Sequence, residues 1–88
     1  MPHTNLNAKD KTFGTTAFHL ACESGNSNIV DMLVQKSAEF NINLNEKDVF
    51  GHSGFHNACN GGHLKVAKML MLSSAEYNID LNSKEKND

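Results

Sequence analysis

The stretch FHLACESGN, residues 18–26, has a near-copy downstream in FHNACNGGH, residues 55–63. In each copy a histidine stands three residues before a cysteine and six residues before a glycine. This spacing is compatible with half of a metal site, with part of a Cys/His catalytic pair, or with one turn of a structural repeat. The sequence on either side of the two copies decides between these alternatives.

The similarity between the two copies continues well beyond these segments. A shift of 37 residues pairs 16–45 with 53–82, and 14 of the 30 pairs are identical. Among them, SAEFNINLN at 37–45 corresponds to SAEYNIDLN at 74–82. Self-similarity at such a period indicates a tandem repeat. We expect one repeat domain over residues 1–88, with a first unit at about 5–42, a second at about 43–79 and a truncated third at 80–88.

Each unit begins with the signals of a short helix. Thr16 and Ser53 are suited to N-capping, because a hydroxyl group accepts from an otherwise unpaired amide of the first turn. Gly25 and Gly62 stand where a left-handed residue ends a helix. These signals predict helices at about 17–24 and 54–61.

A second helix follows in each unit, and its apolar residues form one stripe at helical spacing. The stripe consists of Ile29, Val30, Leu33 and Val34 in the first unit and of Val66, Ala67, Leu70 and Met71 in the second. Asn41 and Asn78 are placed to end these helices in a left-handed conformation. Because neither helix can bury its stripe alone, the units must stack, and the sequence predicts an all-α helical solenoid.

The composition restricts the classes of function. Hydrophobic residues make up 39% of the chain and charged residues 20%, which is typical of a globular protein. The 8 basic and 10 acidic side chains form no block of like charge, which argues against a nucleic-acid partner. No apolar run reaches the roughly 18–20 residues of a membrane span, and no secretory signal begins the chain. With only two cysteines, we expect reduced thiols and an intracellular, cytoplasmic location.

Two segments carry a resemblance to a known family. They are NLNAKDKTFGTTAFHLACESGNSNIVDML at 5–33 and NLNEKDVFGHSGFHNACNGGHLKVAKMLM at 43–71. Both resemble the ankyrin repeat, whose pattern runs N-A-x-D-x-x-G-x-T-P-L-H-x-A-x-x-x-G-H. The resemblance implies an ankyrin-type helical repeat solenoid, in which two antiparallel helix pairs are joined by an extended β-turn or hairpin-like loop.

The chain departs from the family pattern in three ways. The proline of the pattern is Ala17 in one unit and Gly54 in the other, and its leucine is Phe18 or Phe55. The period exceeds the usual 33 residues or so, and the extra residues follow the second helix, where they suit one added turn. Losing the proline removes a favourable preset dihedral, and glycine at position 54 costs up to about 1 kcal/mol relative to alanine. We expect these changes to lower stability without altering the fold.

The resemblance implies structural roles for the shared histidines and cysteines. His19 and His56 would tie the hydroxyls of the N-cap residues to the next turn, and Cys22 and Cys59 would be small, buried or half-buried residues. Stacked units are translated copies, so their His/Cys pairs point the same way and do not converge on one ion. We therefore expect no metal, no cofactor and no catalytic site. A metal or redox protein that uses these pairs is the remote alternative.

In this family, partners are usually engaged by the turn tips and by the exposed face of the first helix. The resemblance therefore implies a non-catalytic protein–protein interaction module with another protein as partner. The corresponding positions are Lys11, Phe13, Thr15, Leu20, Glu23, Val49, Phe50, His52, Asn57 and Asn60. The two units share their framework residues and differ at most of these positions. An aromatic ring recurs at Phe13 and Phe50, and we expect the two rings to pack together between neighbouring tips, with a role as partner anchors as the alternative.

The alternative function is a structural spacer segment of a longer ankyrin-repeat protein, without a partner of its own. Neither end of the chain carries the polar capping repeat that solenoids generally need. Leu64, Met69 and Leu72 lack a following unit that would cover them all. We therefore expect additional flanking repeats or self-association. The sequence does not identify the partner, because the scaffold specifies a geometry and not a target.

Overall fold

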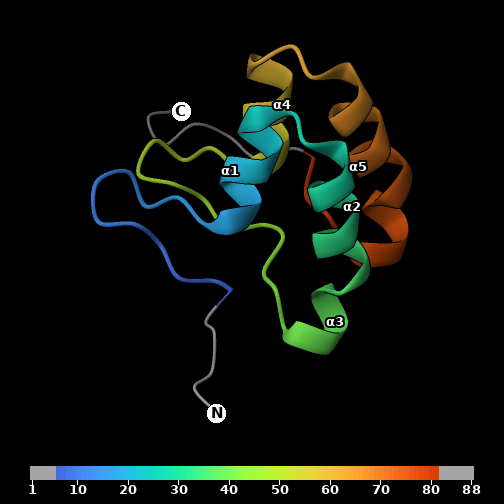
Figure 1. The fold of residues 1–88 in the computed structure, drawn as a ribbon, viewed down its shortest axis with the longest axis horizontal. Coiled ribbons are helices and arrows are strands. Elements are labelled where there is room, and N and C mark those ends of the chain that lie inside the picture. The colour runs from blue at the N-terminus through green and yellow to red at the C-terminus, as the bar shows by residue number, and fades with distance from the viewer. Residues whose placement is uncertain (1–5, 82–88) are drawn as a thin grey trace.

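The computed structural model describes residues 6–81 and confirms the predicted order of helices. The first pair is α1 (Ala17–Ser24) and α2 (Ser27–Gln35), and a single turn, α3 (Ser37–Phe40), follows it. The second pair is α4 (Gly54–Asn60) and α5 (Leu64–Tyr77). Within the described residues the fold is all-α, and the two pairs stack so that α1 lies beside α4 and α2 beside α5 (Figure 1). Most of the predicted third unit, residues 82–88, lies outside the described residues.

The first helix of each unit begins at its predicted cap. The hydroxyl of Thr16 accepts from the amide of His19 at 3.2 Å, and the hydroxyl of Ser53 accepts from the amide of His56 at 3.3 Å. In the first unit the bond is reciprocal, because the amide of Thr16 donates to Nδ1 of His19 at 3.1 Å. These bonds satisfy amides that a helix start would otherwise leave unpaired.

Left-handed residues end the helices at the predicted positions. Gly25 and Gly62 have φ angles of 74° and 73°, and Asn41 and Asn78 have φ angles of 57° and 56°. The residues added to the family period form an extra helical turn before each asparagine, as α3 in the first unit and as the last turn of α5 in the second. The expectation of one added turn is therefore confirmed.

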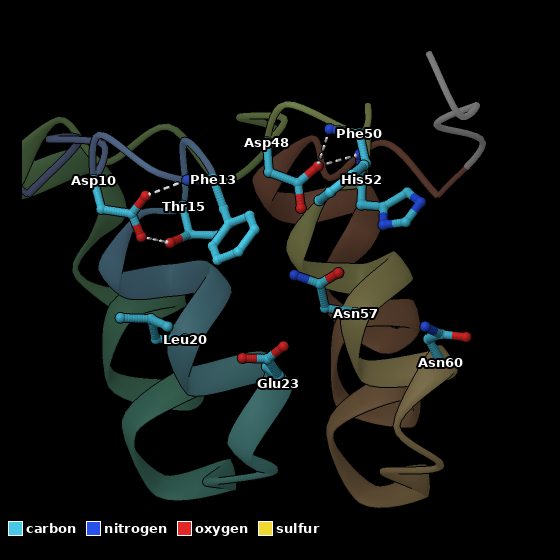
Figure 2. Close-up of a pocket in the computed structure, with 10 residues that line it drawn as sticks. All are labelled: Asp10, Phe13, Thr15, Leu20, Glu23, Asp48, Phe50, His52, Asn57 and Asn60. Carbon is cyan, nitrogen blue, oxygen red and sulfur yellow. Dashed lines mark hydrogen bonds between the residues drawn. The ribbon is translucent and has the colours of Figure 1, made fainter. Parts of the chain in front are cut away.

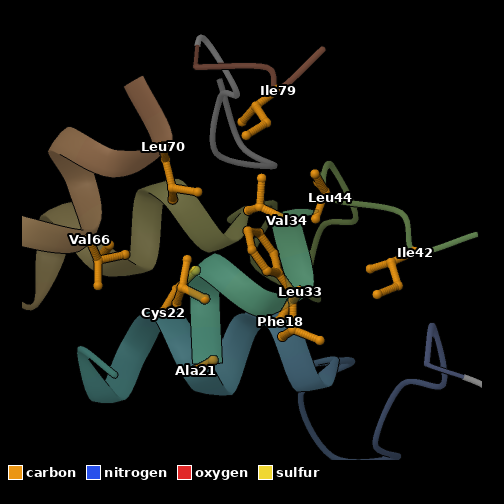
Figure 3. Packing of buried hydrophobic residues seen from close by; sticks show 12 residues of the cluster. Phe18, Ala21, Cys22, Leu33, Val34, Ile42, Leu44, Val66, Leu70 and Ile79 are labelled. Carbon is orange, nitrogen blue, oxygen red and sulfur yellow. The ribbon is translucent and has the colours of Figure 1, made fainter. Parts of the chain in front are cut away.

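The core lies between the two units, with side chains reaching in from both of them (Figure 3). Phe18, Cys22 and Val30 contribute from the first unit, and each is at most 2% exposed. Val66 and Leu70 of α5 meet them from the second unit and are fully buried. The buried contact between the two units therefore stabilises both helix pairs, since neither has a core of its own.

Burial differs between equivalent positions, because each unit turns only one face toward its neighbour. The prediction that the apolar stripe of the second helix is buried is wrong at two positions. Ile29 is 42% exposed and Met71 is 55% exposed. Ile29 lies on the outer face of the first unit and Met71 on the outer face of the second, so no described unit covers either. For the same reason Cys59 is exposed, against the expectation of a buried or half-buried thiol, whereas Cys22 is buried between the units.

Gly54 is required by its contacts with the first unit. A Cβ atom at this position would lie 2.6 Å from Cε2 of Phe18 and 2.9 Å from Sγ of Cys22. Both distances are shorter than van der Waals contact. The lower helix propensity of glycine is therefore offset by the close approach of α4 to a phenylalanine ring, which occupies the position of the family's leucine.

Asparagine side chains connect the loops of neighbouring units. Asn7 donates to the carbonyl of Asn41 at 2.8 Å and accepts from the amide of Asn43 at 2.7 Å. One period later, Asn45 donates to the carbonyl of Asn78 at 2.9 Å and accepts from the amide of Asp80 at 2.7 Å. Each asparagine side chain thus bonds to two backbone groups that lie just after the end of a helix in the next loop. These bonds hold successive loops at the same spacing as the stacked helices.

Candidate functional site

Aspartates at equivalent positions shape the two turn tips. Oδ1 of Asp10 accepts from the amides of Phe13 and Gly14 at 2.7 and 3.0 Å, and its Oδ2 accepts from the hydroxyl of Thr15. Oδ1 of Asp48 accepts from the amides of Phe50 and His52, each at 2.9 Å. The Thr15 hydroxyl, followed by the Phe13 amide, lowers the pKa of the Asp10 carboxyl below its ordinary value. Each carboxylate therefore holds its tip in a fixed conformation.

The tips present a row of rings. The ring centroids of Phe13 and Phe50 are 6.1 Å apart with 29° between the planes, which confirms that the two phenylalanines pack together. His52 lies 6.0 Å beyond Phe50, and its ring stacks on that of His56 at 3.8 Å and 12°. Phe13 and Phe50 are nevertheless 50% and 52% exposed, so part of each ring remains open to solvent.

Below the tips, the exposed faces of α1 and α4 form a floor (Figure 2). α1 contributes Leu20 and Glu23, and α4 contributes Asn57 and Asn60. Leu20 is 55% exposed. No hydrogen bond within residues 6–81 engages the side chains of Glu23, Asn57 or Asn60.

Tips and floor together enclose a groove of about 400 Å³ (Figure 2). Its lining residues are Asp10, Phe13, Thr15, Leu20, Glu23, Asp48, Phe50, His52, Asn57 and Asn60. The groove runs across both units, so each unit supplies half of its wall. It therefore exists only because the two units are stacked.

A family model described as ankyrin repeats (3 copies) matches residues 2–85. The chain belongs to the ankyrin repeat family. No curated protein matches it. Ankyrin repeats are generally modules of protein–protein interaction, and the groove lies on the turn tips and first helices of this ankyrin chain.

The structure brings together all the predicted partner-binding residues except Lys11 and Val49. Lys11 is exposed on the first tip, outside the lining of the groove. The amide of Val49 donates to the carbonyl of Phe13 at 2.9 Å, and its side chain approaches Gly14. Val49 thus joins the two tips of the ankyrin units, although its side chain is still 45% exposed.

Asp10 and Asp48 line the groove, although the sequence pattern did not predict them as part of it. A signal for them was present, because both occupy the aspartate of the ankyrin pattern before an exposed tip. Their role in holding the tip depends on the turn conformation, which places several amides within reach of one carboxylate.

His19 of the first ankyrin unit links the N-cap residue of α1 to the second unit. Nδ1 of His19 accepts from the amide of Thr16, so Nε2 carries the proton and donates to the carbonyl of His52 at 2.8 Å. His19 is 1% exposed. His56 contributes its amide to the Ser53 cap, while its ring stacks on His52.

The described His/Cys pairs show no arrangement for metal or thiolate chemistry. Burial raises the pKa of the Cys22 thiol to about 12, so this thiol is protonated at neutral pH and a poor nucleophile. Within residues 6–81, no group of three or more His, Cys, Asp and Glu residues lies close enough to hold a metal ion. Across the same residues, no helix combines the length and the apolar character needed to cross a membrane.

Proposed function

We propose that this ankyrin chain is a non-catalytic protein-binding module, whose partner binds in the groove formed by the turn tips and the first-helix faces. The observation that carries the proposal is the groove itself. It is open to solvent, spans both units and is lined by half-exposed rings and by the side chains of Glu23, Asn57 and Asn60, which make no hydrogen bond within residues 6–81. A family whose members generally bind proteins uses such a surface for recognition.

Differences between the two units support the same proposal. The framework residues around the caps and the core are the same in both units. In the groove, by contrast, Thr15 of the first unit corresponds to His52 of the second, and Leu20 corresponds to Asn57. Repetition of an entire surface is expected where packing alone matters. Asp and Phe recur at the tips, but the side chains differ at three equivalent positions of the groove, so its surface is asymmetric and suits an asymmetric partner such as a peptide segment.

Lys11 and Val49 remain part of the proposal as contacts at the rim of the groove. Both stand on the tips and are exposed, so a partner that fills the groove and extends past the tips would reach them. An intracellular location is also part of the proposal, since Cys22 and Cys59 are both free thiols.

A second function, that of a structural spacer in a longer repeat protein, is favoured by one observation. Cys59 and Met71 of the second unit are exposed, whereas Cys22 and Val34 at the equivalent positions of the first unit are buried against the second unit. A further unit stacked in the same way would cover both side chains. The two functions use different faces of the molecule, so one experiment separates them.

The experiment compares proteins captured from a cell lysate by the chain and by its Phe50→Ala/Asn57→Ala variant, quantified by mass spectrometry. A groove-binding partner is expected to fall by about tenfold or more, because interface positions of this kind each contribute on the order of 1 kcal/mol. Lys68→Ala on α5 is the control, and it should leave capture unchanged. Equal capture by the chain and the double variant would favour the spacer.

Metal analysis of the purified chain tests the remote alternative of a metal or redox protein. We expect no stoichiometric zinc without chelator, because tetrahedral zinc needs converging ligands. Zinc bound at one equivalent and lost in Cys59→Ser would contradict the proposal.

A further inference from the structure

We propose that the groove binds a basic, linear segment of its partner and takes an arginine side chain of that segment between the rings of the tips and the Glu23 carboxylate. This inference rests on the proposed function and names the chemistry of the partner. It follows from the distribution of charge, from the exposed rings and from the unpaired side chains of the floor.

The groove carries negative charge without a compensating cation in its lining. Three carboxylates, those of Asp10, Glu23 and Asp48, line it, and no lysine or arginine does. The described lysines lie elsewhere, and Lys65 and Lys68 lie together on the outer face of α5. The molecule thus separates an acidic groove from a basic outer face. A cationic segment is attracted to the first surface and repelled by the second.

Glu23 is the carboxylate of the groove that is available to a partner. Asp10 and Asp48 accept from the backbone of their own tips, whereas no bond within residues 6–81 engages the Glu23 side chain. Glu23 also lies in the last turn of α1, where the helix dipole is negative; this turn contains no basic residue, and the ring of His63 reaches the Glu23 carbonyl at 2.6 Å but not the carboxylate. A cation from the partner would therefore be stabilised by both the carboxylate and the helix end.

The exposed rings favour arginine over lysine. Phe13 and Phe50 stack on each other and keep about half of their surface open, so a planar group can lie against them. A guanidinium group stacks on an aromatic face and still donates to a carboxylate at its edge, whereas an ammonium group is a compact, strongly hydrated point charge. Lys11 stands on the first tip but does not line the groove, so the groove itself stays acidic.

The floor favours an extended segment over a folded surface. Asn57 and Asn60 present amide groups that can both donate and accept, and no described residue pairs with their side chains. They are three residues apart on α4 and so share one face. Amide groups on the floor of the groove can bond to the backbone of an extended peptide, which presents its own amides and carbonyls at regular intervals.

The test uses a fluorescently labelled 88-residue chain on an array of random 12-residue peptides. We expect enrichment of peptides that contain arginine. For the strongest of them, Glu23→Gln should weaken binding by about threefold to tenfold and reduce its dependence on salt. Phe50→Leu, which keeps an apolar side chain but removes the ring, should also weaken it. Glu76→Gln, the same charge change on α5, is the control and should change nothing.

The outcomes separate this inference from the proposed function. Enriched peptides that lack basic residues but lose binding in Phe50→Ala/Asn57→Ala would overturn the inference and leave the proposed function standing. Substitution of the selected arginine by lysine without loss would overturn the choice of arginine. If no peptide depends on the groove residues for binding, both proposals fail.

Discussion

Asp10 and Asp48 show how one residue fixes the shape of a binding surface. Each carboxylate gathers the amides of its own tip, and the rings of Phe13 and Phe50 project from the tips that result. The tip therefore depends on an ionised acid at its base. Although Asp10 is exposed, its pKa is lowered by the Thr15 hydroxyl and then by the Phe13 amide.

The lowered pKa of Asp10 predicts a specific dependence on pH. A carboxyl group with a folded pKa below its unfolded value stabilises the fold above the unfolded pKa, and this contribution is lost as pH falls through the folded pKa. Asp10→Asn should therefore lower the urea midpoint at pH 7 and show a weaker fall on acidification than the unchanged chain. Urea unfolding from pH 7 to pH 2 measures both effects, with Glu76→Gln as the control. If the urea midpoint falls equally with pH in the unchanged chain and in Asp10→Asn, the prediction is contradicted.

The local signals of the helices could be read from the sequence, whereas burial could not. Thr16 caps α1 and Gly25 ends it, because these effects involve residues a few positions apart. Cys22 and Cys59 both follow a Phe-His-x-Ala segment, yet one is buried and the other exposed. Which face a second unit covers is a tertiary property that neither segment shows by itself.

The same limit applies to Gly54 in α4. From the sequence alone, this glycine is expected to weaken the helix, because it occupies the first helical position and has a low helix propensity. In the structure it lets the helix approach the ring of Phe18, which stands where the family has a leucine. The two departures from the family pattern thus compensate one another across the interface between α1 and α4.

Gly54→Ala should destabilise the chain despite the higher helix propensity of alanine. We expect a loss of about 1–3 kcal/mol in the free energy of unfolding, because the added methyl group overpacks the interface against Phe18 and Cys22. Combining it with Phe18→Leu should recover part of the loss, since the smaller side chain makes room. Urea unfolding of both single variants and the double variant measures the coupling energy. Additive losses in the double variant would mean that the ring is not the cause.

For the molecule as a whole, stability resides in the interface between the two units. Cys22 lies in this interface and is fully buried, and burial raises the pKa of its thiol to about 12. Cys59 occupies the equivalent position on the outer face and is exposed. The pair therefore reports on separation of the units, with one thiol as the probe and the other as an internal reference.

Labelling with a thiol reagent at pH 7.5 should modify Cys59 rapidly and Cys22 slowly. We expect the Cys22 rate to lie two or more orders of magnitude lower, because labelling requires both exposure and ionisation of the thiol. Gly54→Ala should raise the Cys22 rate and leave the Cys59 rate unchanged. Mass spectrometry of the chain over time resolves the two sites. Equal rates for both thiols in the native chain would show that the units do not stay stacked.

A second copy of the chain cannot simply continue the stack. In the geometry of the internal interface, Phe55 of one copy would meet position 17 of the next, just as Phe18 meets Gly54. Position 17 is alanine, and a Cβ atom at position 54 would lie 2.6 Å from the Phe18 ring. The outer face of the second unit therefore lacks a matching surface on another copy, although its apolar side chains remain exposed.

A different surface, the solvent-facing side of α5, predicts association of the chain at high concentration. Leu64, Met69 and Leu72 line a shallow hollow of about 680 Å³, and Leu72 is 84% exposed, so association would remove apolar surface from water. Leu72→Glu should shift sedimentation toward the monomer, whereas Ala75→Glu adds the same charge on α5 and should act less, because Ala75 lies outside the hollow. A chain that stays monomeric and melts cooperatively well above about 60 °C would contradict the prediction, since it would show that two stacked units suffice without further burial.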